Sequence, residues 1–265
     1  MKFHLTKSLL IGLPISMIVL TTSCKKDTKN DPVEETPAPT GPSYSIPTTY
    51  NFTNADFASS TQRIAMLGEI TTYLRSTHTT TQTTQPTLLA QKLKDMYANV
   101  NSHFTGAGLN SSGIQLKDKT DNTFSFQTTL EASFDDAESA STTSAANPTV
   151  TTASNGVKGK LISPARAILV DANGFEYKEV AEKGIMGTVF YAQATTILKN
   201  IATYDNVTKV NGLTAQEKAW DEAFGYFGVP VDFPTNLTGL KNWGSYCNSV
   251  NSAISSNSAI MNAFL

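Results

Sequence analysis

The stretch that decides the fold is Glu182–Gln193, EKGIMGTVFYAQ, which carries no charge after its lysine yet holds two glycines. A glycine weakens a helix by about 0.8–1 kcal/mol relative to alanine. At 100° per residue, apolar side chains lie on every face of this stretch, which indicates a helix buried on every side. We therefore interpret Gly184 and Gly187 as positions where a neighbouring helix crosses closely. A gap left for a ligand is the alternative.

The rest of the chain is dominated by helical periodicity from about residue 57 onward. The predicted fold is all-α, with one or more helical bundles around a central buried helix over about 176–204, and with long polar loops. At most one short strand is expected, near 166–170, where an AILV run precedes an Asn-Gly turn. The helix with the clearest start follows Thr214, whose spacing to Glu217 is that of a capping box. Other helices are expected at 59–75, 87–100, 126–140, 237–252 and 258–265.

Composition excludes one broad class of function. Apolar residues make up 40% of the 265 residues, which is enough for a core, whereas charged residues make up only 16%. The formal net charge is -2 and no basic stripe is present. These features argue against a nucleic-acid partner.

The first 24 residues have the pattern of an export signal. A cationic start is followed by an apolar run of about 13 residues, which is too short to span a bilayer, and the run ends at TTSC. Small residues before Cys24 resemble the lipobox of bacterial lipoproteins, which implies that Cys24 is lipidated and anchors the protein to a membrane. Lys25 at the next position suggests the outer membrane of the cell envelope. An ordinary cleaved signal peptide with an incidental cysteine is the alternative.

The domain organisation follows from what comes after Cys24. Residues 25–47 are rich in Pro, Thr, Lys and acidic residues and cannot bury a core, so they are expected to form a disordered tether. Residues 48–265 are expected to form one all-helical domain. The remaining cysteine, Cys247, lies at helical core spacing with Trp243, Tyr246 and Val250, which predicts a buried structural thiol.

Two motifs carry a family resemblance. GFEYKEVAEKGIMGTVFYAQ (174–193) and EKAWDEAFGYFGVPVDFP (217–234) resemble a family of uncharacterised Gram-negative envelope lipoproteins distantly related to imelysin. The resemblance implies helical bundles and a role linked to iron or haem uptake. The imelysin signature is Gly-x-His-x-x-Glu, but here Met186 and Val189 stand at the histidine and glutamate positions. Neither side chain ligates a hard or borderline metal, so we predict no metal site and no cofactor.

A further group of candidate residues lies in the second motif. On a helical wheel Trp220, Ala223, Phe224 and Phe227 form a buried face, with Asp221 at its boundary and Glu222 almost opposite. Candidate ligand- or partner-binding residues are therefore Gly184, Gly187, Trp220, Asp221, Glu222 and Tyr226. A solvated face, or a bond from Asp221 to a neighbouring loop, is the simpler interpretation.

Three functions remain open from the sequence. The first is a lipid-anchored, non-enzymatic protein that binds a small ligand or an envelope protein. The second is a metal-dependent hydrolase or peptidase-like enzyme with a site around Asp221 and Glu222. The third is a purely structural interaction module. No catalytic residues are assigned.

Overall fold

The stretch 182–193 is helical, but it is not α-helical throughout. A computed structural model describes residues 45–81 and 83–265, so the expected signal segment, Cys24 and most of the expected tether lie outside the described residues. Helix α4 (Tyr177–Ile185) continues as a π-helix, η2 (Met186–Tyr191), and then as α5 (Ala192–Asn200). A 3₁₀ turn, η3 (Ile201–Thr203), ends it. The helical backbone therefore matches the predicted range of about 176–204.

Groups from outside the helix bond to two carbonyls of the π-helical turn. The indole nitrogen of Trp243, in α7 (Asn242–Ile254), donates to the Met186 oxygen at 3.1 Å. The Asp121 amide donates to the Thr188 oxygen at 2.7 Å. A π-helical turn is a place where external donors can bond to carbonyls of the helical ladder. These two bonds fix the turn against two other parts of the fold.

The two glycines have different roles. A Cβ added at Gly184 would lie 2.1 Å from Cζ of Phe126, so only glycine permits that ring to approach. A Cβ added at Gly187 would meet nothing within 4 Å. The interpretation as a close crossing is therefore right for Gly184 and wrong for Gly187, which faces open space.

Burial along this helix is also uneven. Every position from 184 to 190 is buried or half-buried, whereas Tyr191 is 59% exposed and Leu198 is 36% exposed. The expectation of burial on every side thus fails beyond Phe190. Phe190, Tyr191 and Ala194 line an open groove there, whereas Ile197 of α5 packs against α6.

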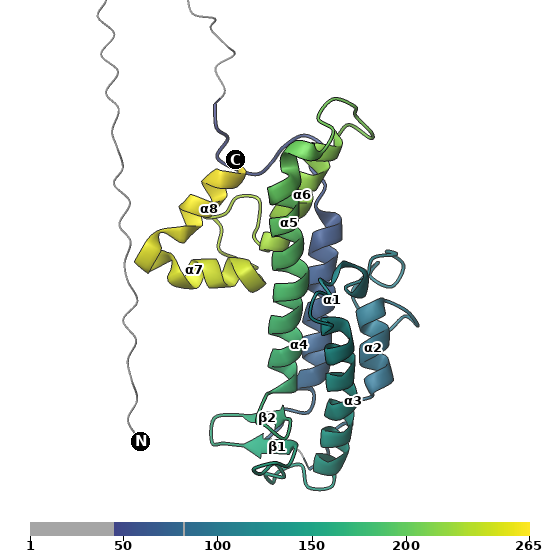
Figure 1. Cartoon of the computed structure of the whole chain (residues 1–265). Helices are drawn as coiled ribbons and strands as arrows, with labels where there is room; N and C mark the ends of the chain where they lie inside the picture. The colour runs from purple at the N-terminus through teal and green to yellow at the C-terminus, as the bar shows by residue number, and fades with distance from the viewer. Residues whose placement is uncertain (1–44, 82) are drawn as a thin grey trace, which may run out of the picture. The chain divides into compact units, whose positions relative to one another are not determined.

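Several of the other helices contact this long helical segment (Figure 1). Helices α1 (Ala58–Arg75) and α3 (Phe126–Ala145) contact α4, α2 (Ala90–Ala98) contacts α3, and α6 (Ala215–Phe227) contacts both α1 and α5. Helix α8 (Ser256–Phe264) follows α7, and a short 3₁₀ turn, η1 (Lys117–Lys119), precedes α3. The region expected as a helix at 87–100 is shorter, because the helix begins only after Leu89, which is extended, and ends before Asn99, which is left-handed.

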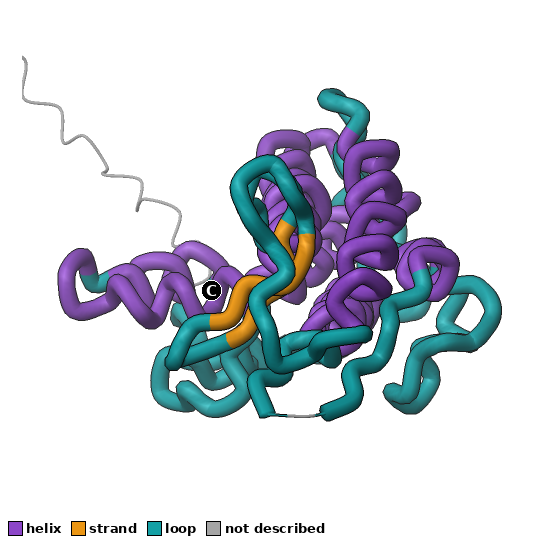
Figure 2. The backbone as a smooth tube through the Cα atoms, turned by 90° about the horizontal axis from the view of Figure 1, so that it is seen from below, coloured by secondary structure: helices purple, strands orange, loops and turns teal. Residues whose placement is uncertain are grey.

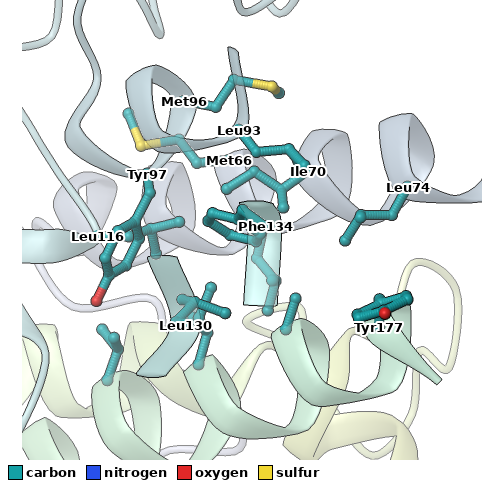
Figure 3. Packing of buried hydrophobic residues seen from close by; sticks show 14 of the residues in the cluster. Met66, Ile70, Leu74, Leu93, Met96, Tyr97, Leu116, Leu130, Phe134 and Tyr177 are labelled. Atoms are coloured by element: carbon teal, nitrogen blue, oxygen red, sulfur yellow. The ribbon is translucent and has the colours of Figure 1, made fainter. Parts of the chain in front are cut away.

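The largest core cluster joins α1, α2, α3 and α4. Figure 3 shows Phe134 of α3 pointing toward Ile70 of α1 and Leu93 of α2, with Tyr177 of α4 at one end. Phe134 is 1% exposed and Leu93 is fully buried. Burying side chains of this size contributes about 1.5–3 kcal/mol each, which makes this cluster a main source of stability.

A two-stranded antiparallel sheet corrects the all-α prediction. Strand β2 (Ala167–Val170) lies where a strand was expected, but β1 (Gly159–Ile162) pairs with it in the register Gly159 to Val170 (Figure 2). The fold is therefore mostly helical with one short hairpin. The sequence did not suggest β1, because β1 contains Lys160 and lysine is usually a surface residue. Its side chain is instead fully buried, and its ammonium donates to the carbonyls of Thr79 at 3.0 Å and Pro148 at 2.8 Å.

The described helices include none that is both long enough and apolar enough to cross a membrane.

The contrast between the two glycines gives a test of the packing. Gly184→Ala should destabilise the protein by about 1–3 kcal/mol, because its methyl group must displace the Phe126 ring. Gly187→Ala is the matched control, and it should be neutral or stabilising by up to about 1 kcal/mol through helix propensity. Urea unfolding of both variants measures the difference. Equal stability of the two variants would contradict the assignment.

Candidate functional site

Local signals fix the position of α6, which carries four of the candidate residues. The capping box is present, since the Thr214 side chain accepts from the Glu217 amide at 3.1 Å and the Glu217 carboxylate accepts from the Thr214 amide at 2.7 Å. Gly228 ends the helix with φ of 77°, a left-handed conformation that glycine adopts at low cost. The positions of these two ends determine in which direction from the helix axis each side chain between them points.

Helix α6 is buried on more than the one face that the helical wheel predicts. Tyr226 is 1% exposed, and Gly225 lies against α1, where an added Cβ would be 2.8 Å from Cβ of Phe57 and from Cβ of Ser60. The Ser60 hydroxyl also donates to the Glu222 carbonyl at 2.7 Å. The prediction of a single buried face is thus wrong, because α1 covers the side that appeared free.

Asp221 lies inside the protein, not at the boundary of a face. It is 4% exposed, and one carboxylate oxygen accepts from the Tyr50 hydroxyl at 2.7 Å. The other oxygen accepts from the Asp56 amide at 2.8 Å. Burial raises the pKa of Asp221, although both hydrogen bonds favour the charged form. The simpler interpretation from the sequence, a bond from Asp221 to a neighbouring segment, therefore describes the contacts.

Glu222 points away from Asp221 and has other partners. Its carboxylate accepts from the Tyr226 hydroxyl at 3.3 Å and lies 3.9 Å from the Lys119 ammonium. Its side chain is 23% exposed. The two carboxylates therefore do not converge on one point, as paired acid and base groups or two ligands of one metal would need to.

A pocket of about 510 Å³ opens beside Asp221, and we call it the Trp220 pocket. Its walls come from the segment before α1, from η3 and α6, and from the end of α8. The lining residues are Tyr50, Phe52, Thr53, Ala55, Ile201, Leu213, Gln216, Glu217, Trp220, Asp221, Ala263, Phe264 and Leu265. The volume lies within the roughly 300–1,000 Å³ of small-molecule sites.

Aromatic contacts hold the walls of the Trp220 pocket in place. Tyr50 stacks on Phe224 with ring centroids 3.7 Å apart. The Trp220 indole nitrogen donates to the Phe264 carbonyl at 3.0 Å, and their rings meet at 73°. Segments far apart in the sequence are thus joined around α6, and Figure 1 shows the purple start of the described chain beside the C-terminal end.

The structure separates the six candidate residues into different places. Trp220 and Asp221 line the Trp220 pocket, whereas Glu222 faces Lys119 and Gly184 is covered by Phe126. Gly187 borders open space and lines none of the pockets described here. Tyr226 lies at the base of a separate groove. No sequence pattern points to Tyr50, Asp56 or Phe264, because only the tertiary fold brings them to α6.

That separate groove is apolar and runs between α5 and the α7–α8 pair. It encloses about 410 Å³, and its residues include Tyr191, Tyr246, Val250 and Ile254. Tyr246 is 46% exposed and Val250 is 45% exposed, so the predicted core face of this helix is only partly covered. Cys247 is buried as predicted, with its sulfur 3.4 Å from the Asn257 side-chain oxygen.

A polar pocket of about 340 Å³ lies near the hairpin. His78 lines it with Arg75, Arg166 and Lys178, and burial together with these cations lowers the pKa of His78 to about 4. Arg166 is paired with Glu176 at 3.2 Å. Within residues 45–81 and 83–265, no three His, Cys, Asp or Glu side chains lie close enough to hold a metal ion.

Removing the Tyr50–Asp221 hydrogen bond should lower the free energy of unfolding by an amount that depends on pH. Tyr50→Phe should destabilise the protein by about 1–3 kcal/mol near pH 7, because a buried carboxylate loses a donor. The pKa of Asp221 is higher in the folded protein than in the unfolded chain. Protonation of this carboxyl therefore stabilises the folded protein at low pH, and that stabilisation is lost as the pH rises. The cost should therefore be smaller at a second, acidic pH, where the carboxyl takes up a proton.

The control for that variant is Tyr191→Phe, since Tyr191 is 59% exposed and a surface change of this kind shifts stability by within about 0.5 kcal/mol. Denaturant unfolding at the two pH values measures both variants. A cost for Tyr50→Phe that equals the control, or that does not change with pH, would contradict the assigned bond.

Comparison with known proteins places the chain in a family. Searches of curated proteins and of solved structures found no significant match. A family model described as a domain of unknown function, DUF4856, matches residues 47–265, which includes both motifs and the Trp220 pocket. The chain therefore belongs to the DUF4856 family, a domain of unknown function.

Proposed function

We propose that this protein is a lipid-anchored protein of the cell envelope that binds a small organic ligand in the Trp220 pocket without transforming it. The observation that carries the proposal is the pocket itself, about 510 Å³ in volume and walled by aromatic side chains around one buried carboxylate. Small-molecule sites have this composition, with apolar walls and a few placed polar groups.

The contacts of the carboxylates favour binding over catalysis. Both oxygens of Asp221 already accept hydrogen bonds from Tyr50 and the Asp56 amide, which positions the group firmly. Glu222, the partner that a hydrolase would require, faces Lys119 on another side of α6. The hydrolase alternative at Asp221 and Glu222 thus has no geometric support.

The envelope location rests on the sequence of the first 47 residues. The cationic start, the apolar run, TTSC and the polar segment after it form the arrangement of a lipoprotein with a tether. In this proposal Cys24 carries the lipid, and residues 25–47 hold the domain away from the outer membrane.

The relation to imelysin-like proteins belongs to the same proposal. Helices α1, α3 and α6 contact the 177–203 segment, and these contacts support the bundle that the resemblance implies. Met186 and Val189, which replace the histidine and glutamate of the signature, are 2% and 0% exposed and belong to the main core cluster. A link to iron or haem uptake would therefore work through a ligand or partner bound elsewhere than at these positions.

Blocking the Trp220 pocket tests the binding function. Ligand-observed NMR screening of small organic molecules against the full-length protein should give binders, and Thr53→Trp should abolish their binding. Thr53 is exposed and lines the pocket, so its indole can enter the space without disturbing the core. Ala132→Trp is the matched control, because Ala132 is also exposed and lines a different cleft.

Two outcomes would contradict the proposal. One is a screen that yields no binder at all. The other is a set of binders that Thr53→Trp and Ala132→Trp affect equally, which would place the binding outside the Trp220 pocket.

Anchoring has its own test. Cys24→Ser should move the protein from the membrane fraction to the soluble fraction of cells that express it, because the thiol that accepts the lipid is gone. Cys247→Ser is the control, since Cys247 is buried in the domain and should leave membrane association unchanged. Sedimentation of the Cys24→Ser variant with membranes would show that the anchor lies elsewhere.

A further inference from the structure

The charges that line the Trp220 pocket have one sign. Asp221 and Glu217 contribute carboxylates, and the described residues that line the pocket include no lysine, arginine or histidine. Glu217 is partly exposed, and its carboxylate lies 3.6 Å from the ammonium of Lys209, which is not among the lining residues. The pocket is thus an acidic, aromatic space whose deeper charge is that of Asp221.

Asp221 has neutral donors but no cation beside it. Its two oxygens accept from a tyrosine hydroxyl and a backbone amide. The ion pairs that reach α6 in the described part of the chain involve Glu217 and Glu222, not Asp221. A buried carboxylate without a counter-charge is costly, and such groups concentrate at functional sites. A positive charge that enters the pocket would supply the missing counter-charge.

The aromatic rings add a second preference for positive charge. Tyr50 and Phe52 have ring centroids 5.0 Å apart at 87°, and Trp220 and Phe264 have centroids 5.9 Å apart at 73°. Rings that meet at steep angles form adjacent walls, and ring faces attract ammonium groups within about 6 Å. Aromatic cages are an arrangement that proteins use to bind organic ammonium ions, and a carboxylate adds an opposite charge.

We propose that the ligand of the Trp220 pocket is an organic cation, with an ammonium group near Asp221 and an apolar body against Phe52, Trp220 and Phe264. This inference rests on the proposed function, since it names the chemical class that the same pocket takes. The charge selects the ligand, and the apolar walls contribute affinity that is independent of charge.

The test uses three probes of matched shape: 2-phenylethylamine, which is cationic, 2-phenylethanol, which is neutral, and phenylacetate, which is anionic. Isothermal titration calorimetry of the full-length protein in a nonionic detergent measures each affinity near neutral pH. The cation should bind about tenfold or more tighter than the alcohol, and the anion should bind more weakly than the alcohol.

Two variants locate the charge preference. Asp221→Asn should reduce the preference for the amine over the alcohol to below about twofold, and Asp135→Asn is its control in another cleft. Because Asp221→Asn can impair folding, Thr53→Lys provides an independent variant at an exposed position of the pocket wall. It should weaken amine binding at least about fivefold and strengthen phenylacetate binding, whereas Ala132→Lys should change neither.

The outcomes separate this inference from the proposed function. Equal affinities for the three probes, or a preference for phenylacetate, would overturn the cation assignment and leave a ligand pocket in place. A second result would also overturn the cation assignment alone: none of the three probes binds, but the wider screen yields compounds whose binding Thr53→Trp abolishes. Failure of every compound in both experiments would overturn both proposals.

Discussion

One buried carboxylate holds together the part of the molecule where we place its function. Asp221 accepts hydrogen bonds from Tyr50 and from the Asp56 amide, and so ties the segment before α1 to α6. Tyr50 in turn stacks on Phe224 and contacts Phe264, which brings in the end of α8. Together with these ring contacts, the Asp221 bonds join the walls of the Trp220 pocket, which come from three segments that are distant in sequence.

The sequence was sufficient wherever a local rule decides the structure. The capping box at Thr214 is a local signal, and it occurs where the pattern predicts it. The strand at 167–170 and the close approach at Gly184 were also correctly predicted, since a β-rich run and a glycine in an apolar helix restrict the possibilities. Local chemistry thus predicted most of the helices.

Elements that depend on distant partners could not be predicted. The π-helical turn at 186–191 is held by donors from Trp243 and Asp121, and β1 is stabilised by carbonyls that accept from the buried Lys160. The inward position of Asp221 depends on a tyrosine 171 residues away in the sequence. A helical wheel treats each helix alone, so it placed Asp221 at a boundary and left the α1-facing side of α6 uncovered.

Hydrogen exchange at the Asp56 amide tests the central claim most directly, because that single group reports whether Asp221 holds the segment before α1. The amide donates to a buried carboxylate, so its exchange should be slowed to a rate that requires opening of the structure. The Thr53 amide, on an exposed residue of the same segment, should exchange quickly. An Asp56 amide that exchanges as fast as that of Thr53 would contradict the account.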